Sequence, residues 1–189
     1  MRRHWAVAFV IAAFASTGYS QQPPLGFKDL VPGQPKGDGD IAAALECRGD
    51  TCSYIPGVAV GVVRHEMTIG GSEILAIVAT LKEGVIQAVL VQFHLEAFNT
   101  IRDGLKAKYP SLTCHNGSIQ NRLGASFEQE KCIAKIDRST MVVDRYGDTI
   151  EHGQLAIVLD SAVEEKQQEK RKRSLISNAL NVLETATGR

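Results

Sequence analysis

The sequence predicts an α+β fold: a mainly antiparallel sheet with one or two helices packed on one face, followed by a C-terminal helical tail. Short apolar runs that end at turn residues recur along the chain, which is typical of strands. Between residues 95 and 109 the apolar residues instead recur every three to four positions, which indicates an amphipathic helix. A chain of 189 residues, 44% of them hydrophobic, has room for one such domain with an ordinary core.

Charge and composition exclude some partners. The 21 basic and 21 acidic residues balance, so the chain lacks the basic excess that is typical of nucleic-acid-binding proteins. Aromatic residues make up only 6%, which does not favour an aromatic-lined groove for sugars or bases. We therefore expect no nucleic-acid partner.

The first 20 residues have the order of a secretory signal peptide. A basic leader at residues 1–4 precedes an uncharged apolar run of 11 residues at 5–15, and small or polar residues follow at 16–20. Eleven residues are too few to cross a hydrocarbon core of about 30 Å as a helix, and no later window is long and apolar enough. Cleavage is expected after Ala15 or after Ser20, and no cysteine lies near either position, so a lipid anchor is not expected. Removing the leader removes two arginines and no acid, so a periplasmic or secreted mature chain has a net charge of −2.

The four cysteines predict two disulfides, because an even count in an exported chain is typical of such bridges. Three pairings are possible, and we favour Cys47–Cys52 with Cys114–Cys132 because each joins near neighbours around turn-rich segments. A zinc site is not favoured, since the spacings are C-x4-C and 18 residues rather than C-x2-C. We expect no metal ion and no cofactor.

Residues 21–39 are rich in Pro and Gly and predict an irregular arm ahead of an α+β domain at 40–160. Asp40 is expected to cap a short helix over 41–46, and Cys47 to Gly57 to form loops. Gly84 supplies the positive φ that a tight hairpin needs. The strands expected in this half of the domain lie at residues 58–63, 66–69, 74–81 and 85–93.

The second half of the domain is expected to hold the amphipathic helix and three strands. Pro110 ends the helix, because proline disfavours the helical conformation of the residue before it. A loop is expected through Asn116-Gly117. The strands that follow are expected at residues 125–136, 140–146 and 154–159.

Residues 161–189 predict a C-terminal amphipathic helix. Its apolar stripe would pack on the sheet or form an oligomer seam, and consists of Leu175, Ile176, Ala179, Leu180, Val182 and Leu183. Its basic run is interpreted as a solvated helix face, with contact to anionic phospholipid or an acidic partner as the alternative. That run comprises Lys170, Arg171, Lys172 and Arg173.

Most sequence motifs of catalytic and cofactor sites are either absent or lack the neighbouring segments that such sites need. A G-x-G-x-x-A pattern at residues 37–42 follows a Pro-rich segment, whereas a dinucleotide site needs a buried strand there. The chain has no G-x-S-x-G sequence and no phosphate-binding loop of the G-x4-G-K form. His94 and Glu96 share a face if the chain is extended, so a hydrolase that uses this pair is an alternative function.

Arg48-Gly49-Asp50 lies between Cys47 and Cys52, so a disulfide would project this tripeptide from a constrained loop. It resembles the adhesion tripeptide that integrins recognise. The ordinary interpretation is a tight turn, because Gly and Asp favour turns. A secreted adhesin is therefore a further alternative.

The order of segments resembles small exported proteobacterial proteins of uncharacterised function. The resemblance lies in Lys82-Glu83-Gly84, the helix ending FNTIRDGLKAKYP at residues 98–110, Tyr146-Gly147 and Gly153-Gln154-Leu155. The start, Val31-Pro32-Gly33 leading to residues 41–45, is distantly similar to the outer-membrane assembly lipoproteins of the BamE kind. The resemblance implies an exported protein and a fold type rather than a reaction. We expect a non-catalytic protein that binds another protein or an envelope component.

Overall fold

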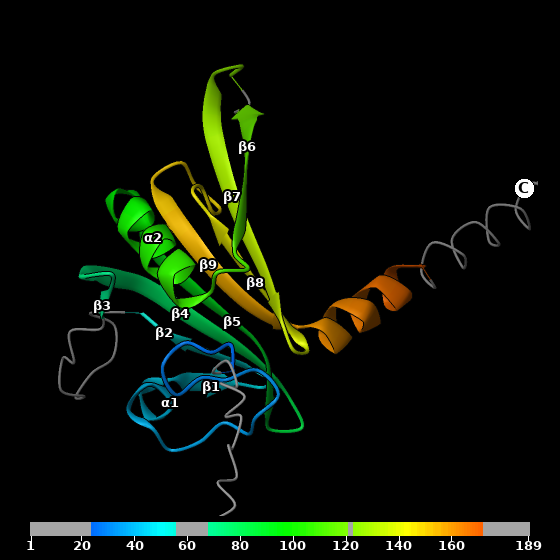
Figure 1. Cartoon of the computed structure of the whole chain (residues 1–189). Coiled ribbons are helices and arrows are strands. Elements are labelled where there is room, and N and C mark those ends of the chain that lie inside the picture. The colour runs from blue at the N-terminus through cyan, green and yellow to red at the C-terminus, as the bar shows by residue number, and fades with distance from the viewer. Residues whose placement is uncertain (1–23, 56–67, 121–122, 172–189) are drawn as a thin grey trace, which may run out of the picture.

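The computed structural model describes residues 24–55, 68–120 and 123–171. Their nine strands form one antiparallel sheet with the order β1-β2-β4-β5-β9-β8-β7-β6, and β3 pairs with β4 (Figure 1). The expected α+β class is wrong, because strands account for 49% of the described residues and helices for 23%, so the molecule is closer to an all-β protein. The physical reason is that two polar stretches expected as loops pair as strands. The first is Cys47 to Gly57, and the second is the segment around Asn116-Gly117.

The elements have the following bounds in chain order. They are α1 (Asp40–Ala44), β1 (Glu46–Arg48), β2 (Thr51–Tyr54), β3 (Thr68–Ile69), β4 (Ser72–Lys82), β5 (Val85–His94), the 3-10 helix η1 (Leu95–Ala97), α2 (Phe98–Lys108), β6 (Thr113–Gln120), β7 (Ser126–Ile136), β8 (Ser139–Asp144), β9 (His152–Leu159) and a helix described over residues 160–171. The strand expected at 58–63 lies outside the described residues, as do the first two residues of the one at 66–69, whose last two residues form β3.

The core lies on one face of the sheet. Directly paired residues form a buried row across four central strands: Ile77, Val91, Leu155 and Val143. Phe98 and Ile101 of α2 belong to the same buried cluster, together with residues of the N-terminal segment and α1, among them Leu25, Leu30, Ile41 and Leu45. The alternation of side chains in a strand puts the intervening residues on the opposite face.

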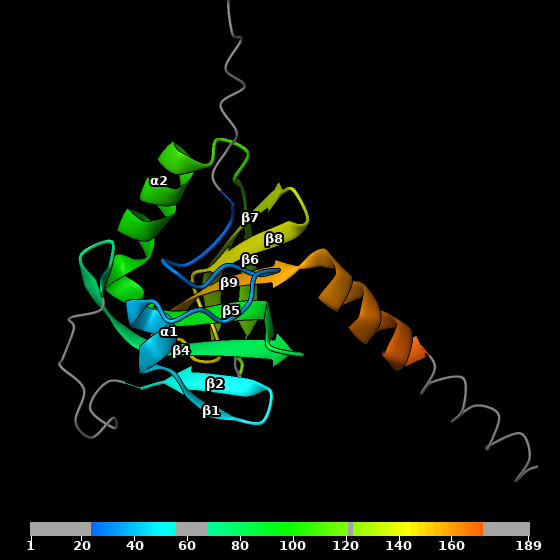
Figure 2. The ribbon, with the colours of Figure 1, turned by 90° about the horizontal axis from the view of Figure 1, so that it is seen from below.

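That opposite face is called the open face here. Its central row runs through paired residues of five strands: Val78, Leu90, Ala156, Val142 and Ile133. All five are half-buried, and none is fully buried as the residues of the core row are. Figures 1 and 2 show the helix of residues 160–171 leading away from the sheet.

The N-terminal cap of α1 differs from the expected one. Asp40 is the first residue of the helix and not its cap. Instead the carboxylate of Asp29 accepts hydrogen bonds from the backbone N–H groups of Ile41 (3.1 Å) and Ala42 (3.0 Å). The cap residue Gly39 permits this approach, because a Cβ atom there would overlap the Asp29 side chain. Asp29, twelve residues before Ile41, thus supplies the capping carboxylate that was expected from Asp40.

The β4–β5 turn is the expected hairpin. Lys82 pairs with Val85 in register, and the two residues between them, Glu83 (φ 53°) and Gly84 (φ 78°), both have positive φ. Positive φ at both central positions is the requirement of a type I′ turn, whose twist matches that of the strands.

The C-terminal helix starts from a polar anchor at the end of β9. Asp160 accepts a hydrogen bond from the Thr140 hydroxyl (2.7 Å) and pairs with the Lys135 ammonium (2.9 Å). Lys82 and Glu165 make an exposed ion pair at 2.7 Å. The apolar stripe expected at residues 175–183 lies outside the described residues. Among those that the structure does describe, no helix is both long enough and apolar enough to span a membrane.

Candidate functional site

The most distinctive part of the molecule is a two-stranded arm at one end of the sheet. Residues 126–130 of β7 pair only with residues 116–120 of β6, because β8 pairs with β7 from Lys131 onward. These ten residues are called the arm. Figure 1 shows the arm extending beyond the rest of the sheet. A two-stranded ribbon is marginally stable alone, so contacts at its base decide its position.

A disulfide fixes the base of the arm. Cys114 of β6 lies directly opposite Cys132 of β7, and the two sulfur atoms are bonded. The second bridge, Cys47–Cys52, likewise joins directly opposed residues of β1 and β2. These are the two bridges that the spacing favours. They join each edge strand of the sheet to its neighbour.

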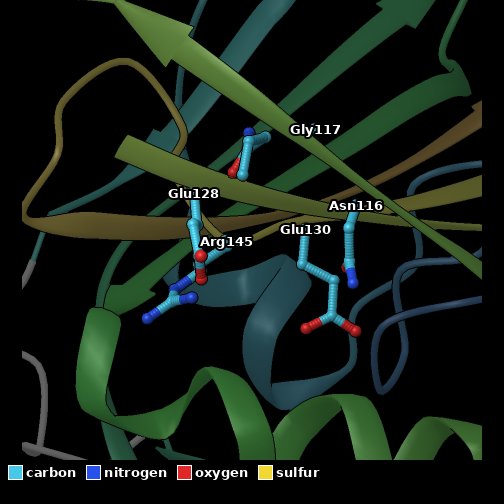
Figure 3. A pocket seen from close by; sticks show the side chains of 6 residues that line it. Asn116, Gly117, Glu128, Glu130 and Arg145 are labelled. Atoms are coloured by element: carbon cyan, nitrogen blue, oxygen red, sulfur yellow. The ribbon is translucent and has the colours of Figure 1, made fainter. Parts of the chain in front are cut away.

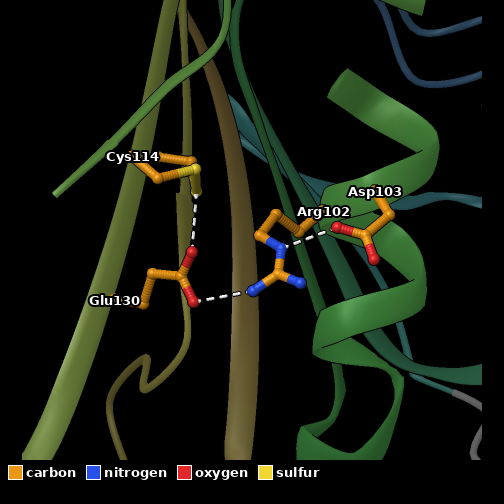
Figure 4. Close-up of polar contacts among 5 residues, drawn as sticks. Arg102, Asp103, Cys114 and Glu130 are labelled. Carbon is orange, nitrogen blue, oxygen red and sulfur yellow. Dashed lines mark hydrogen bonds and ion pairs between the residues drawn. A yellow bond between two sulfur atoms is a disulfide. The ribbon is translucent and has the colours of Figure 1, made fainter. Parts of the chain in front are cut away.

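A half-buried ion pair fixes the arm to α2. The Arg102 guanidinium lies 2.9 Å from the Glu130 carboxylate and 2.8 Å from that of Asp103 (Figure 4). The hydrogen bond to Asp103, and then that to Glu130, raises the pKa of Arg102. The same hydrogen bond lowers the pKa of Asp103. Arg102 therefore stays charged and joins helix and arm.

A side-chain amide fixes the arm to the loop after β8. Gln129 donates to the backbone carbonyl of Tyr146 and accepts from its N–H, both at 3.0 Å. The rings of Phe127 and Tyr146 meet edge to face with centroids 6.1 Å apart. Such a pair adds about 1 kcal/mol beyond its buried area. The arm is held by both of its neighbours.

A polar cavity of about 330 Å³ lies beneath the arm, on the side of α2 (Figure 3). Its lining consists of Asn116, Gly117, Glu128, Gln129, Glu130 and Arg145. Figure 3 shows the Glu128, Glu130 and Arg145 side chains pointing toward α2. Both acidic and basic groups face this cavity, so it suits a polar ligand rather than an apolar one.

The outer side of β6 presents unpaired backbone groups. The carbonyl of Glu130 accepts from Arg145 N–H (2.9 Å), so it points away from its β6 partner Asn116. The pair Asn116–Glu130 is therefore a non-hydrogen-bonded one, and the N–H and C=O of Asn116 point outward. By alternation the same holds for Ser118. Within the described ranges no strand pairs with this side of β6.

Three groups that could hold a metal ion lie together at the base of the arm. The sulfur atoms of Cys114 and Cys132 and a Glu130 oxygen all lie within 4.8 Å of one another. The sulfur atoms form a disulfide, however, and a metal ligand must be a thiolate. The two sulfur atoms are close because they are bonded to each other, and Glu130 lies beside this bridge.

The structure places His94 and Glu96 at the junction between β5 and η1. His94 ends β5 and Glu96 lies in η1, and both side chains are exposed. Neither lines the cavity beneath the arm or the one of about 280 Å³ beside the N-terminal segment. No hydrogen bond joins the two within the part of the chain that the structure describes. The hydrolase that would use this pair stays a prediction.

Arg48-Gly49-Asp50 occupies the tip of the β1–β2 hairpin. Arg48 pairs with Thr51, so Gly49 and Asp50 form a two-residue turn directly beyond the Cys47–Cys52 bridge. Gly49 has φ 59°, which a type II′ turn requires at its first position. All three residues of the motif are exposed, and the disulfide constrains them as expected.

The basic run is only partly described. Lys170 and Arg171 are exposed at the described end of the C-terminal helix, and Lys172 and Arg173 lie outside the described residues. The two described side chains make no ion pair within residues 24–55, 68–120 and 123–171. Their position agrees with a solvated helix face.

In comparisons with known proteins, no family model, curated protein or solved structure matches the chain.

The residues that build the arm were not identifiable from the sequence as site residues. Arg102 and Glu130 are 28 positions apart and carry no motif. Asn116-Gly117 is a sequence typical of a turn, but here both residues are in the middle of β6. The one usable signal was the favoured pairing of Cys114 with Cys132, which predicts that the segments around the two cysteines lie side by side.

Proposed function

We propose that this chain is an exported, non-catalytic protein that binds a partner protein, and that the partner adds an extended segment to the outer edge of β6. The observation that carries the proposal is the character of this edge. β6 is eight residues long, seven of its residues are exposed, and it contains no proline, lysine, arginine, aspartate or glutamate.

Edge strands of stable proteins are normally kept from pairing by charges, proline, short length or a covering element. β6 has none of these protections among the described residues, and its outward N–H and C=O groups are a template for a further strand. Binding by strand addition draws its affinity from such main-chain groups. The Cys114–Cys132 bridge, Arg102 and Gln129 hold the edge in place, which lowers the ordering cost of binding.

Site-specific cross-linking tests this mode of binding. A photoreactive benzoylphenylalanine at Asn116 in the full chain, expressed in its own cell, is expected to form one discrete adduct with a partner protein. Ser118→Pro removes an outward N–H without removing a bond to β7, so it should abolish the adduct. Ser118→Thr keeps that N–H and should preserve the adduct.

Two outcomes contradict the proposal. One is an adduct of equal yield in Ser118→Pro and Ser118→Thr, because the partner would then not use the backbone of β6. The other is the absence of any adduct from Asn116 while a photoreactive residue at Glu46, on the opposite edge, forms one.

Export is supported by the leader and by the two disulfides, which are compatible with an oxidising compartment. Cell fractionation followed by intact mass measurement tests it. We expect an envelope or secreted protein that lacks the leader and that gains the hydrogens of two reduced bridges on treatment with a thiol. A full-length, fully reduced chain in the cytoplasm would contradict export.

A second candidate is adhesion through Arg48-Gly49-Asp50, which the exposed, disulfide-bounded hairpin tip favours. Asp50→Glu keeps the charge and lengthens the side chain, so integrin-dependent cell attachment to the immobilised protein should be lost. Attachment that Asp50→Glu does not alter excludes this candidate. Asp38→Glu, outside the motif, is the matched control.

A further inference from the structure

Two histidines form the terminal pair of the ladder between the central strands β5 and β9. His94 is the last residue of β5, His152 is the first of β9, and the two are direct partners in the ladder. β5 is flanked by β4 and β9, and β9 by β5 and β8, so both strands are held on either side. The two histidines pair with each other, and the residues next to them are held by β4 at Phe93 and by β8 at Gln154.

The neighbouring pair determines where these imidazoles point. Phe93 is fully buried and is paired with Gly153, where a Cβ atom would overlap the Phe93 ring. The ring therefore lies over Gly153 on the core face. Because successive side chains in a strand point to opposite faces, His94 and His152 both lie on the open face.

The hydrogen-bond pattern brings these two side chains close together. The N–H of Leu95 donates to the carbonyl of Glu151 (3.3 Å), so the adjacent pair His94–His152 occupies a non-hydrogen-bonded position. Opposed residues at such positions have Cα atoms about 4.5 Å apart, the shortest separation that a ladder offers.

Both imidazoles are available to a ligand. His94 is exposed and His152 is half-buried. Neither ring takes part in a hydrogen bond or ion pair within the described part of the chain. Two neighbouring imidazoles without partners on a rigid ladder are a preorganised pair of nitrogen donors.

We propose that His94 and His152 together bind one divalent transition-metal ion of the class that prefers imidazole, Ni²⁺, Cu²⁺ or Zn²⁺. The two histidines supply two ligands, and water completes the coordination shell. With two protein ligands the ion remains exchangeable. This site is distinct from β6, so its presence or absence does not bear on the strand-addition proposal.

Isothermal titration of the tag-free exported chain with Ni²⁺ tests the site. We expect one ion per chain. His94→Asn and His152→Asn should each lower the affinity by about tenfold or more, because even loss of an outer-shell partner costs about 10- to 100-fold. His115→Asn, which removes an exposed histidine of β6 on the same face, should leave binding unchanged.

A second measurement needs no variant and therefore no assumption about folding. Paramagnetic Ni²⁺ added to the isotope-labelled wild-type chain should broaden the amide signals of residues 92–95 and 151–154 first. Binding retained in His94→Asn or His152→Asn, or broadening centred on His115 or elsewhere, overturns the proposal. So does the absence of any Ni²⁺ binding by the wild-type chain.

Discussion

The two edge strands of the sheet, β1 and β6, are both held by a disulfide but differ in length and charge. Each edge strand is joined to its neighbour by a disulfide between directly opposed residues, Cys47–Cys52 at β1 and Cys114–Cys132 at β6. β1, however, has three residues, two of which are charged, whereas β6 has eight and none that carries a permanent charge. The covalent bridge stabilises an edge, but charge and length decide whether that edge can accept another strand.

The two edge strands therefore differ in how well they can pair with a further strand. The three-residue strand β1 begins with Glu46 and ends with Arg48, so it offers too few backbone groups for a partner strand and its charges oppose pairing. β6 offers outward groups along its whole length and is anchored by α2 through Arg102. The predictions that follow separate what stabilises each edge from what makes one of them a binding surface.

The largest expected effect comes from removing the bridges one at a time. In the chain-entropy model, Cys114→Ala/Cys132→Ala lowers the free energy of unfolding by about 3 kcal/mol and Cys47→Ala/Cys52→Ala by about 2, because the first bridge closes the longer loop. Urea unfolding of the two double variants measures both values. The reverse order would show that the β1 bridge, and not the β6 bridge, is the main anchor.

A smaller effect is expected where α2 meets the arm. Arg102→Met and Glu130→Gln should show a coupling free energy of about 1 kcal/mol in a double-mutant cycle, since the pair is half-buried, with side-chain exposures of 21% and 18%. The exposed pair Lys82–Glu165 is the control, with exposures of 52% and 62%, and should show less coupling. Equal coupling in both cycles would contradict an anchoring role for Arg102.

Giving β6 the protection of β1 should change binding far more than stability. Ser118→Lys places a charge on the edge and should abolish the Asn116 cross-link, while the free energy of unfolding changes by less than about 0.5 kcal/mol. Glu46→Lys on β1 is the matched change and should leave the cross-link intact. A cross-link that survives Ser118→Lys argues against strand addition.

The smallest expected effect is a pH dependence at the anchor. The hydrogen bond from Arg102 lowers the pKa of Asp103 in the folded state. A carboxyl with a lowered folded pKa stabilises the protein above its unfolded pKa of about 3.9, and this contribution is lost as pH falls through the folded value. Acid unfolding followed by circular dichroism should thus show a shallower loss of stability below about pH 4 in Asp103→Asn than in the wild type. An identical acid profile would mean that Asp103 contributes nothing.

The centre of the sheet was predictable from the sequence, and its edges were not. Long apolar runs identified β4, β5 and β9 to within one or two residues, because burial on one face requires apolar side chains. β1, β2 and β6 were expected as loops. Edge strands need bury little, so their sequences contain polar and turn-forming residues such as Asn116-Gly117, and no periodicity distinguishes them from loops.

The candidate site was predictable only through its cysteines. Their spacing favoured the bridges at both edges and the constrained Arg48-Gly49-Asp50 turn. The contacts of Arg102 with Glu130 and of Gln129 with Tyr146 depend on which strands become neighbours, which a single sequence without a motif does not show. His94 was identified as a candidate, but its partner across the sheet is His152 rather than the nearby Glu96.

The strand order has a consequence for when the protein becomes stable. β1 to β5 form one set of neighbouring strands and β6 to β9 another, and the two sets meet only where β9 pairs with β5. Since β9 is the last strand of the described residues, neither half can be completed by the other until residues 152–159 have been synthesised. Folding of this sheet is therefore governed by its longest-range pairing, and a chain truncated before His152 would carry two half-sheets with an open seam.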